Sequence, residues 1–243
     1  MQLKVVSSGS IGNCYILNGK DSTLLIECGV KYQQILEQLD YDVFKVKACI
    51  VTHSHGDHAK SISQIMQNGI PIYASKGTFD KLKISKEQRY KEVEHLKGYN
   101  VNGGFQVMSF DVEHDAPQTM GYLINHDECG NILFITDTYR LKWDFGIAFD
   151  HIVIEANFCE ELVKDKSDSF INKRRYRAHM SFQTAMLTLQ RMDLSNCKNI
   201  VLIHLSDTCS DENRFKQECI ERFGIPTTIA TKGQIINFSK EGF

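Results

Sequence analysis

The chain has 243 residues, of which 42% are hydrophobic and 24% charged, a composition typical of a globular protein rather than a disordered or fibrous one. Its 28 Lys and Arg against 30 Asp and Glu give a formal net charge of −2, which disfavours an extended nucleic acid as partner. No apolar run reaches the roughly 18 to 20 residues that span a bilayer, and the N-terminus lacks a signal-peptide pattern. We therefore expect a cytoplasmic protein without a membrane segment.

Strand-like segments outnumber helical ones along the chain. Runs rich in Val, Ile and Phe, bounded by Gly, Asn or Asp, predict strands at 2–6, 14–18, 23–27, 47–52, 70–74, 105–112, 120–125, 131–136, 151–155, 199–204, 227–230 and 234–238. Apolar residues spaced by 3.6 predict helices at 31–39, 58–67, 180–192 and 211–223. Without a linker or a repeat, this pattern favours a single domain over 1–243, with sheets covered by helices in an α+β fold.

The eight cysteines are scattered along the chain, and no two of them form a C-x-x-C pair. Several lie inside apolar runs. This usage predicts buried thiols in a reducing compartment rather than disulfides or a structural zinc cluster.

Four apolar strands end on chemically competent residues. ACIVT runs into His53, NILFIT into Asp137, HIVI into Glu155 and NIVLI into His204. Ligand sites in layered folds gather at the carboxyl ends of strands, where side chains from separate strands converge. We therefore expect these four residues to share one site.

The segment H-S-H-G-D-H at residues 53–58 carries the sharpest signal. His53 and His55 are two apart on extended chain and share a side, while Asp57 and His58 lie on the turn into the next helix. Gly56 permits the tight turn between them. Imidazole and carboxylate donors at this density suit zinc, with manganese or iron also compatible.

The other histidines carry weaker signals when each is taken alone. His114 follows a long strand, and His204 ends an apolar strand where an unpartnered imidazole would be costly. His179 stands just before a helix that Ser181 can cap. We interpret the rest as structural or surface residues: His95, His126 and His151.

The ordered set T-H-S-H-G-D-H, His114, Asp137 and His204 resembles the metallo-β-lactamase superfamily, in its RNase Z-like phosphodiesterase branch. The segments SSGSIGNCYIL, ECG, HDAPQTMGY and HLSD resemble more closely the YycJ/WalJ-like hydrolases and the neighbouring phage anti-Pycsar proteins, which degrade cyclic mononucleotides. The resemblance covers nearly the whole chain and implies a four-layered αβ/βα sandwich. It is far more specific for the superfamily than for the substrate.

The resemblance implies two metal ions, expected to be Zn²⁺ with Mn²⁺ as an alternative. One ion would be held by His53, His55 and His114, the other by Asp57, His58 and His204, with Asp137 bridging them. A bridging carboxylate can hold two ions about 3.5 to 4 Å apart, which suits in-line displacement at phosphorus. Glu27 departs from the family, which usually has an aspartate at this supporting position.

Phosphodiester hydrolysis, unlike lactam hydrolysis, needs a proton for an alkoxide leaving group. Glu155 and His179 resemble the Glu and His that assist the leaving group in RNase Z-like enzymes. In the predicted mechanism Asp57 orients the attacking hydroxide or takes its proton, and His179, oriented by Glu155, protonates the departing oxygen. The catalytic residues expected are therefore Asp57, Glu155 and His179.

The near-neutral charge and the lack of a protruding Gly/Pro-rich arm for tRNA favour a small substrate. We expect a 3′,5′-cyclic mononucleotide, opened to a 5′-monophosphate, and a phage protein in the host cytoplasm that evades Pycsar immunity. The alternatives are a YycJ/WalJ-like or RNase Z-like nuclease acting on DNA or RNA ends, and a noncatalytic nucleotide-sequestering protein.

Three further features have less certain roles. The basic run 173–177 either reaches the site or lies on a solvated loop. Four aromatic residues lie near site loops and are candidates for base stacking: Tyr139, Trp143, Phe158 and Tyr176. The family implies a homodimer, in which the polar segment 80–100 would reach the partner's site.

Overall fold

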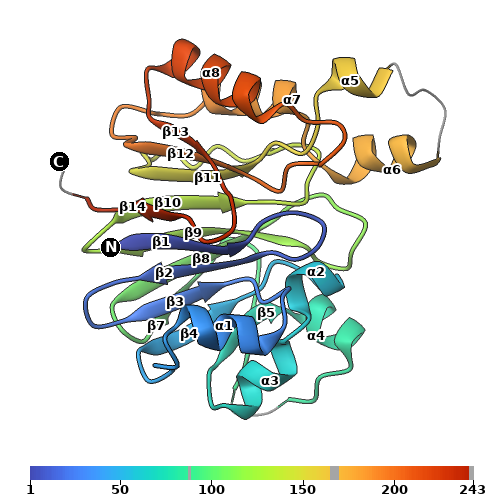
Figure 1. Cartoon of the computed structure of the whole chain (residues 1–243). Helices are drawn as coiled ribbons and strands as arrows, with labels where there is room; N and C mark the ends of the chain where they lie inside the picture. Colours follow the sequence, from blue (N-terminus) through green and yellow to red (C-terminus); the bar gives the residue numbers. More distant parts are fainter. Residues whose placement is uncertain (87–88, 165–169, 241–243) are drawn as a thin grey trace.

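Two seven-stranded sheets pack face to face, and helices cover their outer faces (Figure 1). The structure is a computed structural model that describes residues 1–86, 89–164 and 170–240. The first sheet contains β1 (Gln2–Ser7), β2 (Cys14–Asn18), β3 (Thr23–Ile26), β4 (Val46–Ile50), β5 (Ile72–Ser75), β6 (Tyr90–Val93) and β14 (Ile235–Asn237). The second contains β7 (Lys97–Val101), β8 (Phe105–Asp111), β9 (Met120–His126), β10 (Gly130–Ile135), β11 (His151–Glu155), β12 (Asn199–Ile203) and β13 (Thr227–Ile229).

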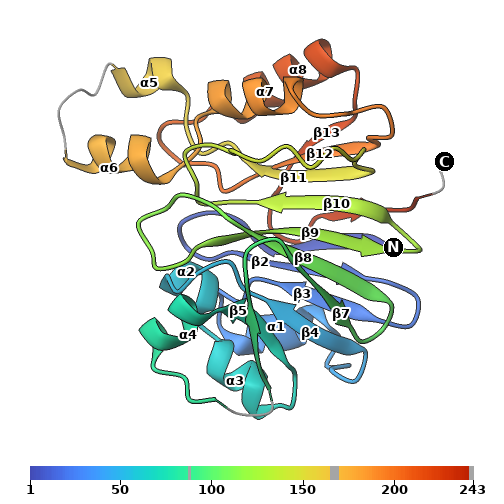
Figure 2. The ribbon, with the colours of Figure 1, turned by 180° about the vertical axis from the view of Figure 1, so that it is seen from behind.

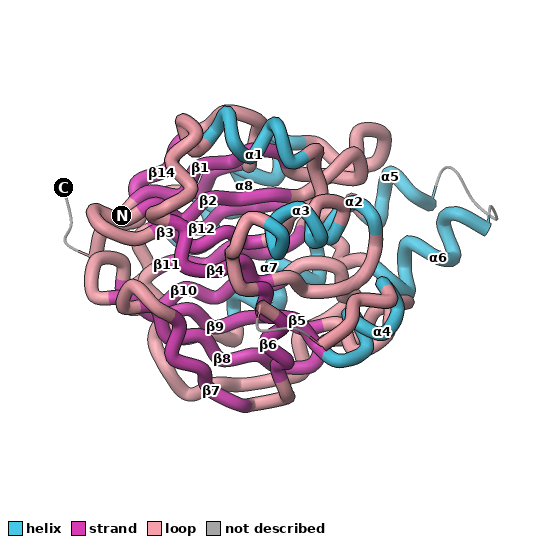
Figure 3. The backbone as a smooth tube through the Cα atoms, turned by 90° about the horizontal axis from the view of Figure 1, so that it is seen from below, coloured by secondary structure: helices cyan, strands magenta, loops and turns pink. Residues whose placement is uncertain are grey.

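The helices form the two outer layers and one end of the molecule. They are α1 (Tyr32–Gln38), α2 (Gly56–Ala59), α3 (Ile62–Gln67), α4 (Lys76–Leu82), α5 (Glu160–Lys164), α6 (Phe170–Ala178), α7 (Phe182–Gln190) and α8 (Glu212–Phe223). Seen from behind, α5 and α6 lie at the end opposite to the N-terminus and β14 (Figure 2). Seen from below, α2 and α4 lie at the same end as α5 and α6 (Figure 3). This arrangement is the expected four-layered αβ/βα sandwich of the α+β class.

Both sheets change from antiparallel to parallel pairing partway across. The first runs in the order β14-β1-β2-β3-β4-β5-β6 and is parallel from β3 to β6. The second runs in the order β13-β12-β11-β10-β9-β8-β7 and is parallel from β10 to β13. Parallel strands in one sheet end at the same edge, so the carboxyl ends of β3 and β4 meet, and so do those of β10, β11 and β12.

Three large apolar cores hold the layers together, and a small fourth cluster of Phe158, Val163 and Cys209 lies beside α5. The core between the sheets includes Tyr15 of β2 and Phe134 of β10, whose rings meet edge to face with centroids 5.6 Å apart. A second core lies between β10–β12 and the helices α7 and α8, where Phe182 stacks on Phe215. A third lies under α1, α3 and α4. Each fully buried aromatic contributes about 2 kcal/mol of hydrophobic stabilisation, so the strand ends project from a rigid scaffold.

All twelve predicted strands and all four predicted helical regions are present; β2 and β11 have the predicted bounds and the others differ by a few residues. The helix predicted at 58–67 is two helices, α2 and α3, because the Ser61 backbone N–H donates to the Cys28 carbonyl and its hydroxyl to the Val30 carbonyl. The helix predicted at 180–192 begins only at Phe182, because the Ser181 hydroxyl caps it by accepting from the Thr184 N–H.

Sequence patterns missed β6, β7, α4, α5 and α6, whose residues are too polar to show apolar periodicity. The polar segment 80–100 contains the edge strand β6 and all but the last residue of the edge strand β7, and part of it (87–88) falls outside the described residues. The basic run 173–177 is therefore helical rather than a loop, as part of α6.

The predicted burial of the thiols is confirmed, since all eight cysteines are free and seven are buried, Cys197 being half-buried. Within residues 1–86, 89–164 and 170–240, no helix has the length and apolar character needed to cross a membrane.

Candidate metal and active site

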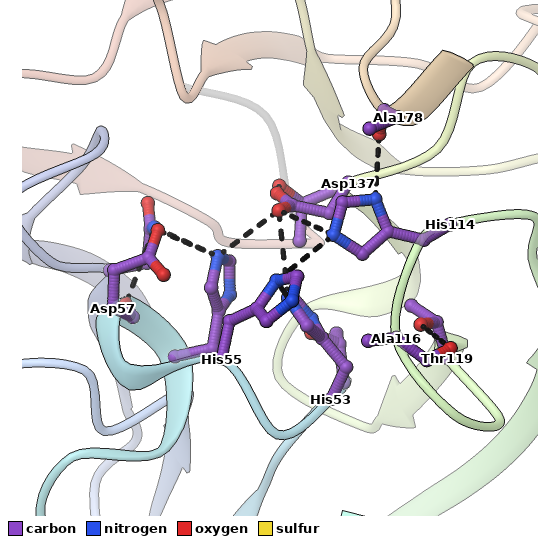
Figure 4. Close-up of polar contacts among 12 residues, drawn as sticks. His53, His55, Asp57, His114, Ala116, Thr119, Asp137 and Ala178 are labelled. Atoms are coloured by element: carbon purple, nitrogen blue, oxygen red, sulfur yellow. Dashed lines mark hydrogen bonds and ion pairs between the residues drawn. The ribbon is translucent and has the colours of Figure 1, made fainter. Parts of the chain in front are cut away.

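The first group of candidate metal ligands is His53, His55, His114 and Asp137, which converge from three separate segments (Figure 4). The His55 Nδ1 atom lies 3.0 Å from His53 Nε2 and 3.2 Å from His114 Nε2. The Asp137 Oδ2 atom lies 3.6 Å from His53 Nε2 and 3.4 Å from His114 Nε2. One small volume therefore receives three imidazole nitrogens and a carboxylate oxygen.

This donor set fits a divalent cation. Burial lowers the pKa of His53 well below its ordinary value and also lowers that of His114, so both rings are neutral and offer lone pairs. Lone pairs of neutral imidazoles that face one another repel unless a proton or a cation lies between them. A cation coordinated by all of them satisfies the group at once.

The second group is Asp57, His58 and His204, next to the same Asp137. The His58 Nε2 atom lies 3.4 Å from Asp57 Oδ2 and 3.4 Å from Asp137 Oδ2, while His204 Nε2 lies 3.8 Å from Asp57 Oδ2. The structure thus brings together every residue predicted as a ligand, with Asp137 between the two groups as expected for a bridge.

Negative charge in this second group is balanced by protons on the histidines. Burial opposes ionisation of Asp137, but His204 and His58 outweigh it and hold its pKa well below the ordinary value. Burial likewise opposes protonation of His204, yet Asp137 and Glu155 raise its pKa to about 10. A metal ion replaces such protons as the counter-charge, which is the usual exchange at metal sites.

The backbone bends sharply where three strands deliver residues to the site. Glu27 after β3, Asp137 after β10 and His204 after β12 have φ values of 64°, 49° and 55°. Residues other than glycine seldom adopt this left-handed region, and their clustering is typical of a functional site that its surroundings hold in place. The bends redirect these side chains from the sheets into the shared site.

Glu27, predicted as a supporting residue, lies behind His58. Its Oε2 atom is 3.6 Å from His58 Nδ1, and its Oε1 atom accepts from the Thr52 backbone N–H at 3.2 Å. The glutamate thus faces the ring nitrogen that points away from the candidate metal position at ion-pair distance, without a hydrogen bond to it. Burial opposes protonation of His58, but the negative charges of Asp137 and Glu27 outweigh it and raise the pKa of His58.

Two further supports escaped prediction because they depend on chain segments that are distant in sequence. Asn13 donates its backbone N–H to the Asp57 carbonyl at 2.7 Å, and its side-chain Nδ2 lies 3.1 Å from His58 Nε2. A Cβ atom on Gly29 would lie 1.6 Å from the Asp57 carbonyl oxygen. Only glycine therefore allows this close approach, and both residues belong to segments singled out by the family resemblance.

Glu155 and His179, the predicted acid pair, form a hydrogen bond of 2.7 Å between Glu155 Oε1 and His179 Nδ1. Burial alone would lower the pKa of His179, but the Glu155 carboxylate raises it above the ordinary value. The His204 Nδ1 atom also lies 3.1 Å from Glu155 Oε1, a contact the sequence did not predict. The backbone N–H groups of Thr138 and Met180 donate to Oε2, so every oxygen of this buried carboxylate is engaged.

The site opens into a cleft of about 580 Å³ lined by His179, by two arginines of the basic run and by four of the candidate ligands, namely His55, Asp57, Asp137 and His204. The two arginines are Arg174 and Arg175 of α6. The Arg174 Nε atom donates to Asp115 Oδ2 at 2.6 Å, and Asp115 Oδ1 lies 3.2 Å from His114 Nε2. The basic run therefore reaches the site mouth.

The four aromatic residues named as candidates for base stacking do not line the cleft. Phe158 is 1% exposed and packs edge to face against Tyr176, so it cannot stack on a base. Trp143 packs on His95 and lines a different hollow. His126 and His151 are buried structural residues, as expected.

Known families, relatives and solved structures match both the sequence and the fold of this chain. The family model of the beta-lactamase superfamily domain matches residues 22–205. The exodeoxyribonuclease YycJ of Bacillus anthracis is 25% identical over 96% of this chain and 90% of its own length. The metallo-β-lactamase-fold protein YhfI of Bacillus subtilis superposes with a TM-score of 0.75, at 18% identity over 96% of this chain and 97% of its own.

The human short-form tRNase Z superposes with a TM-score of 0.68, at 18% identity over 98% of this chain and 99% of its own. Both structural matches extend over nearly the whole of each chain. With the family model covering most of the sequence, the chain belongs to the beta-lactamase superfamily and has the metallo-β-lactamase fold.

Proposed function

We propose that this chain is a dinuclear zinc phosphodiesterase. The observation that carries the proposal is the buried Glu155–His179 hydrogen bond beside the two groups of candidate ligands. A phosphodiester needs both a site for a polarising cation and a proton donor for the leaving oxygen. The YycJ relative, which is an exodeoxyribonuclease, supports the same class of chemistry.

The residues that would hold the metals are the seven predicted ones, with Zn²⁺ favoured over Mn²⁺ because five of the donors are imidazoles. They are His53, His55 and His114 for one ion, Asp57, His58 and His204 for the other, and Asp137 for both. When bound, the ions supply charge stabilisation at the phosphoryl oxygens and lower the pKa of the attacking water.

The protein's own groups supply orientation and proton transfer. Asp57 lines the cleft wall and orients the attacking water or takes its proton. His179 acts as the general acid. Glu155 holds its Nδ1 atom, so that its Nε2 atom can donate a proton to the departing oxygen. The raised pKa of His179, which burial opposes and Glu155 causes, keeps this proton available near neutral pH.

The substrate that we infer is a 3′,5′-cyclic mononucleotide, released as a 5′-monophosphate. A cleft of about 580 Å³ lies in the range of small-molecule sites. The net charge of −2 also supports a small substrate over a long polyanion. With this substrate, the biological role is evasion of Pycsar immunity by a phage protein in the host cytoplasm, acting as a homodimer.

The second candidate is hydrolysis at the end of a DNA strand, which the similarity to the exodeoxyribonuclease YycJ favours. The two substrates differ in the number of phosphates bound. Strand binding weakens steeply as salt rises from 50 to 200 mM, roughly in proportion to the phosphates neutralised, whereas binding of a monoanionic cyclic nucleotide changes little.

The leaving-group dependence of a His179→Asn variant tests the proposed chemistry. Loss of the proton donor lowers kcat for an alkoxide leaving group by about 100- to 10,000-fold. For bis(4-nitrophenyl) phosphate, whose leaving group needs no proton, we expect less than about a tenfold loss. The control is His95→Gln, at a histidine that packs on Trp143 outside the cleft. Equal losses on both substrates at unchanged zinc content would show that His179 is not the acid.

A further inference from the structure

Helix α6 docks onto the candidate site through one face. Arg174 and Ala178 are four residues apart, so they lie on the same side of the helix, one turn from each other. The Ala178 carbonyl accepts a hydrogen bond of 2.7 Å from His114 Nδ1, and Arg174 Nε donates to Asp115 at 2.6 Å. One face of α6 therefore contacts both His114, through Ala178, and Asp115, through Arg174.

The Arg174 guanidinium is only partly used by this contact. Its Nε atom is engaged by Asp115, but its two terminal amino groups have no hydrogen-bond partner among the described residues. The side chain is 53% exposed and lines the cleft together with Asp57, Asp137 and His179. An arginine held at Nε keeps its planar pair of Nη donors directed as a unit, which matches the geometry of a phosphate.

The neighbouring arginines are less suited to this task. Arg175 also lines the cleft, but its Nη1 atom lies 3.0 Å from the Cys209 Sγ atom. Arg177 is exposed and does not line the cleft. Within the part of α6 whose side chains are described, Arg174 alone combines a fixed Nε atom, two available Nη groups and a place in the cleft wall.

We propose that Arg174 is a phosphate-binding residue of the active site, with Asp115 as its positioning residue. The inference rests on the proposed phosphodiesterase function and deepens it by assigning a non-bridging phosphoryl oxygen to the Arg174 Nη groups. Asp115 cannot bind the phosphate itself, because both are anions; its role is to fix the direction of the guanidinium.

The test is the binding of inorganic phosphate to the zinc-loaded protein by calorimetry, together with KM and kcat for bis(4-nitrophenyl) phosphate. Loss of a charge-assisted bidentate contact in Arg174→Gln is expected to raise the Kd for phosphate by about ten- to hundredfold and KM by a similar factor. The value of kcat should change by less than about fivefold. Arg174→Lys should restore part of the phosphate affinity, because it keeps the charge without the fork.

The matched control is Arg177→Gln, which removes the same charge from an exposed position of α6 and should leave both constants unchanged. Asp115→Asn should raise the Kd for phosphate by about three- to tenfold while Arg174 is still present. If Arg174→Gln binds phosphate as the Arg177→Gln variant does, Arg174 is not the phosphate residue.

Failure of the proposed phosphodiesterase function can be told apart from failure of the Arg174 subsite. If the wild-type protein binds phosphate through Arg174 but turns over no phosphodiester, the subsite stands and the proposed function falls. If the wild-type protein hydrolyses phosphodiesters and Arg174→Gln matches it in KM and phosphate Kd, the function stands and the subsite falls. If zinc content drops in Arg174→Gln but not in Arg177→Gln, Arg174 supports the metal site instead, and the inference is overturned.

Discussion

A single buried carboxylate, Glu155, connects the two chemical parts of the site. Its Oε1 atom contacts Nδ1 of both His179 and His204, so one residue orients a candidate proton donor and a candidate metal ligand. Contacts of this kind fix which ring nitrogen carries the proton and leave the other nitrogen free to act. The sequence predicted that Glu155 and His204 share a site, but it paired Glu155 directly with His179 only, because the bond to His204 arises from the parallel pairing of β11 with β12.

Replacing Glu155 by glutamine should therefore damage two functions at once. The amide keeps the shape but cannot accept from both imidazoles and both backbone N–H groups. We expect zinc affinity to fall by about 10- to 100-fold and kcat to fall by at least about 100-fold, measured by chelator competition and steady-state kinetics. His179→Asn should lower kcat alone. Wild-type zinc affinity in Glu155→Gln would contradict the double role.

His151, at the start of β11 and far along the strand from the site, gives a pH prediction of its own. It is fully buried and stacks on Phe238, and burial lowers its pKa to about 4. The unfolded chain, where a histidine has a pKa of about 6.5, thus binds more protons between these values. The stabilising contribution is complete above pH 6.5 and is lost as the pH falls toward 4.

The measurement is the free energy of unfolding of wild type and His151→Phe, both prepared without metal, from pH 7.5 to 4.5. The phenylalanine ring keeps the stack but does not titrate. The free energy of unfolding of the variant should rise relative to that of the wild type as the pH falls, by about 2.5 kcal/mol at pH 4.5. A constant difference between the two proteins across this range would show that folding does not lower the pKa of His151.

At the scale of elements, the site depends on short segments that dock against one another. The segment around Gly29 packs on the first turn of α2, while α6 brings its face to His114 and Asp115. The histidine-rich segment was predictable because its donors are adjacent in sequence. The contributions of Asn13, Gly29 and Asp115 were not, because each acts through a contact between segments that only the folded chain brings together. Arg174 was indicated only as a member of the basic run 173–177.

Gly29→Ala tests the docking of α2. Its Cβ atom would lie 1.6 Å from the Asp57 carbonyl oxygen, so the backbone that carries Asp57 and His58 must move. We expect a loss of about 1 to 3 kcal/mol in the free energy of unfolding and weaker binding at the second metal position. Gly98→Ala is the control, because a Cβ there meets nothing within 4 Å. Equal zinc stoichiometry and stability in the two variants would contradict the account.

At the scale of the whole molecule, the two sheets each turn parallel on one side and direct the ends of those strands to a common site. The apolar strands made most of this architecture predictable, because burial on both faces leaves long Val- and Ile-rich runs such as β11 and β12. The polar edge strands β6 and β7 and the charged helix α6 could not be found in this way, since their pairing and docking supply the stability that their composition does not.

The most direct measurement is product analysis after the zinc-loaded protein is incubated with a panel of cyclic mononucleotides, a DNA strand, precursor tRNA, a β-lactam and a thioester. The account predicts many turnovers of a phosphodiester, with cyclic mononucleotides opened to 5′-monophosphates. Turnover of DNA or tRNA alone would keep the phosphodiesterase chemistry and replace the substrate. Hydrolysis of the lactam or thioester with every phosphodiester left intact would contradict the central claim.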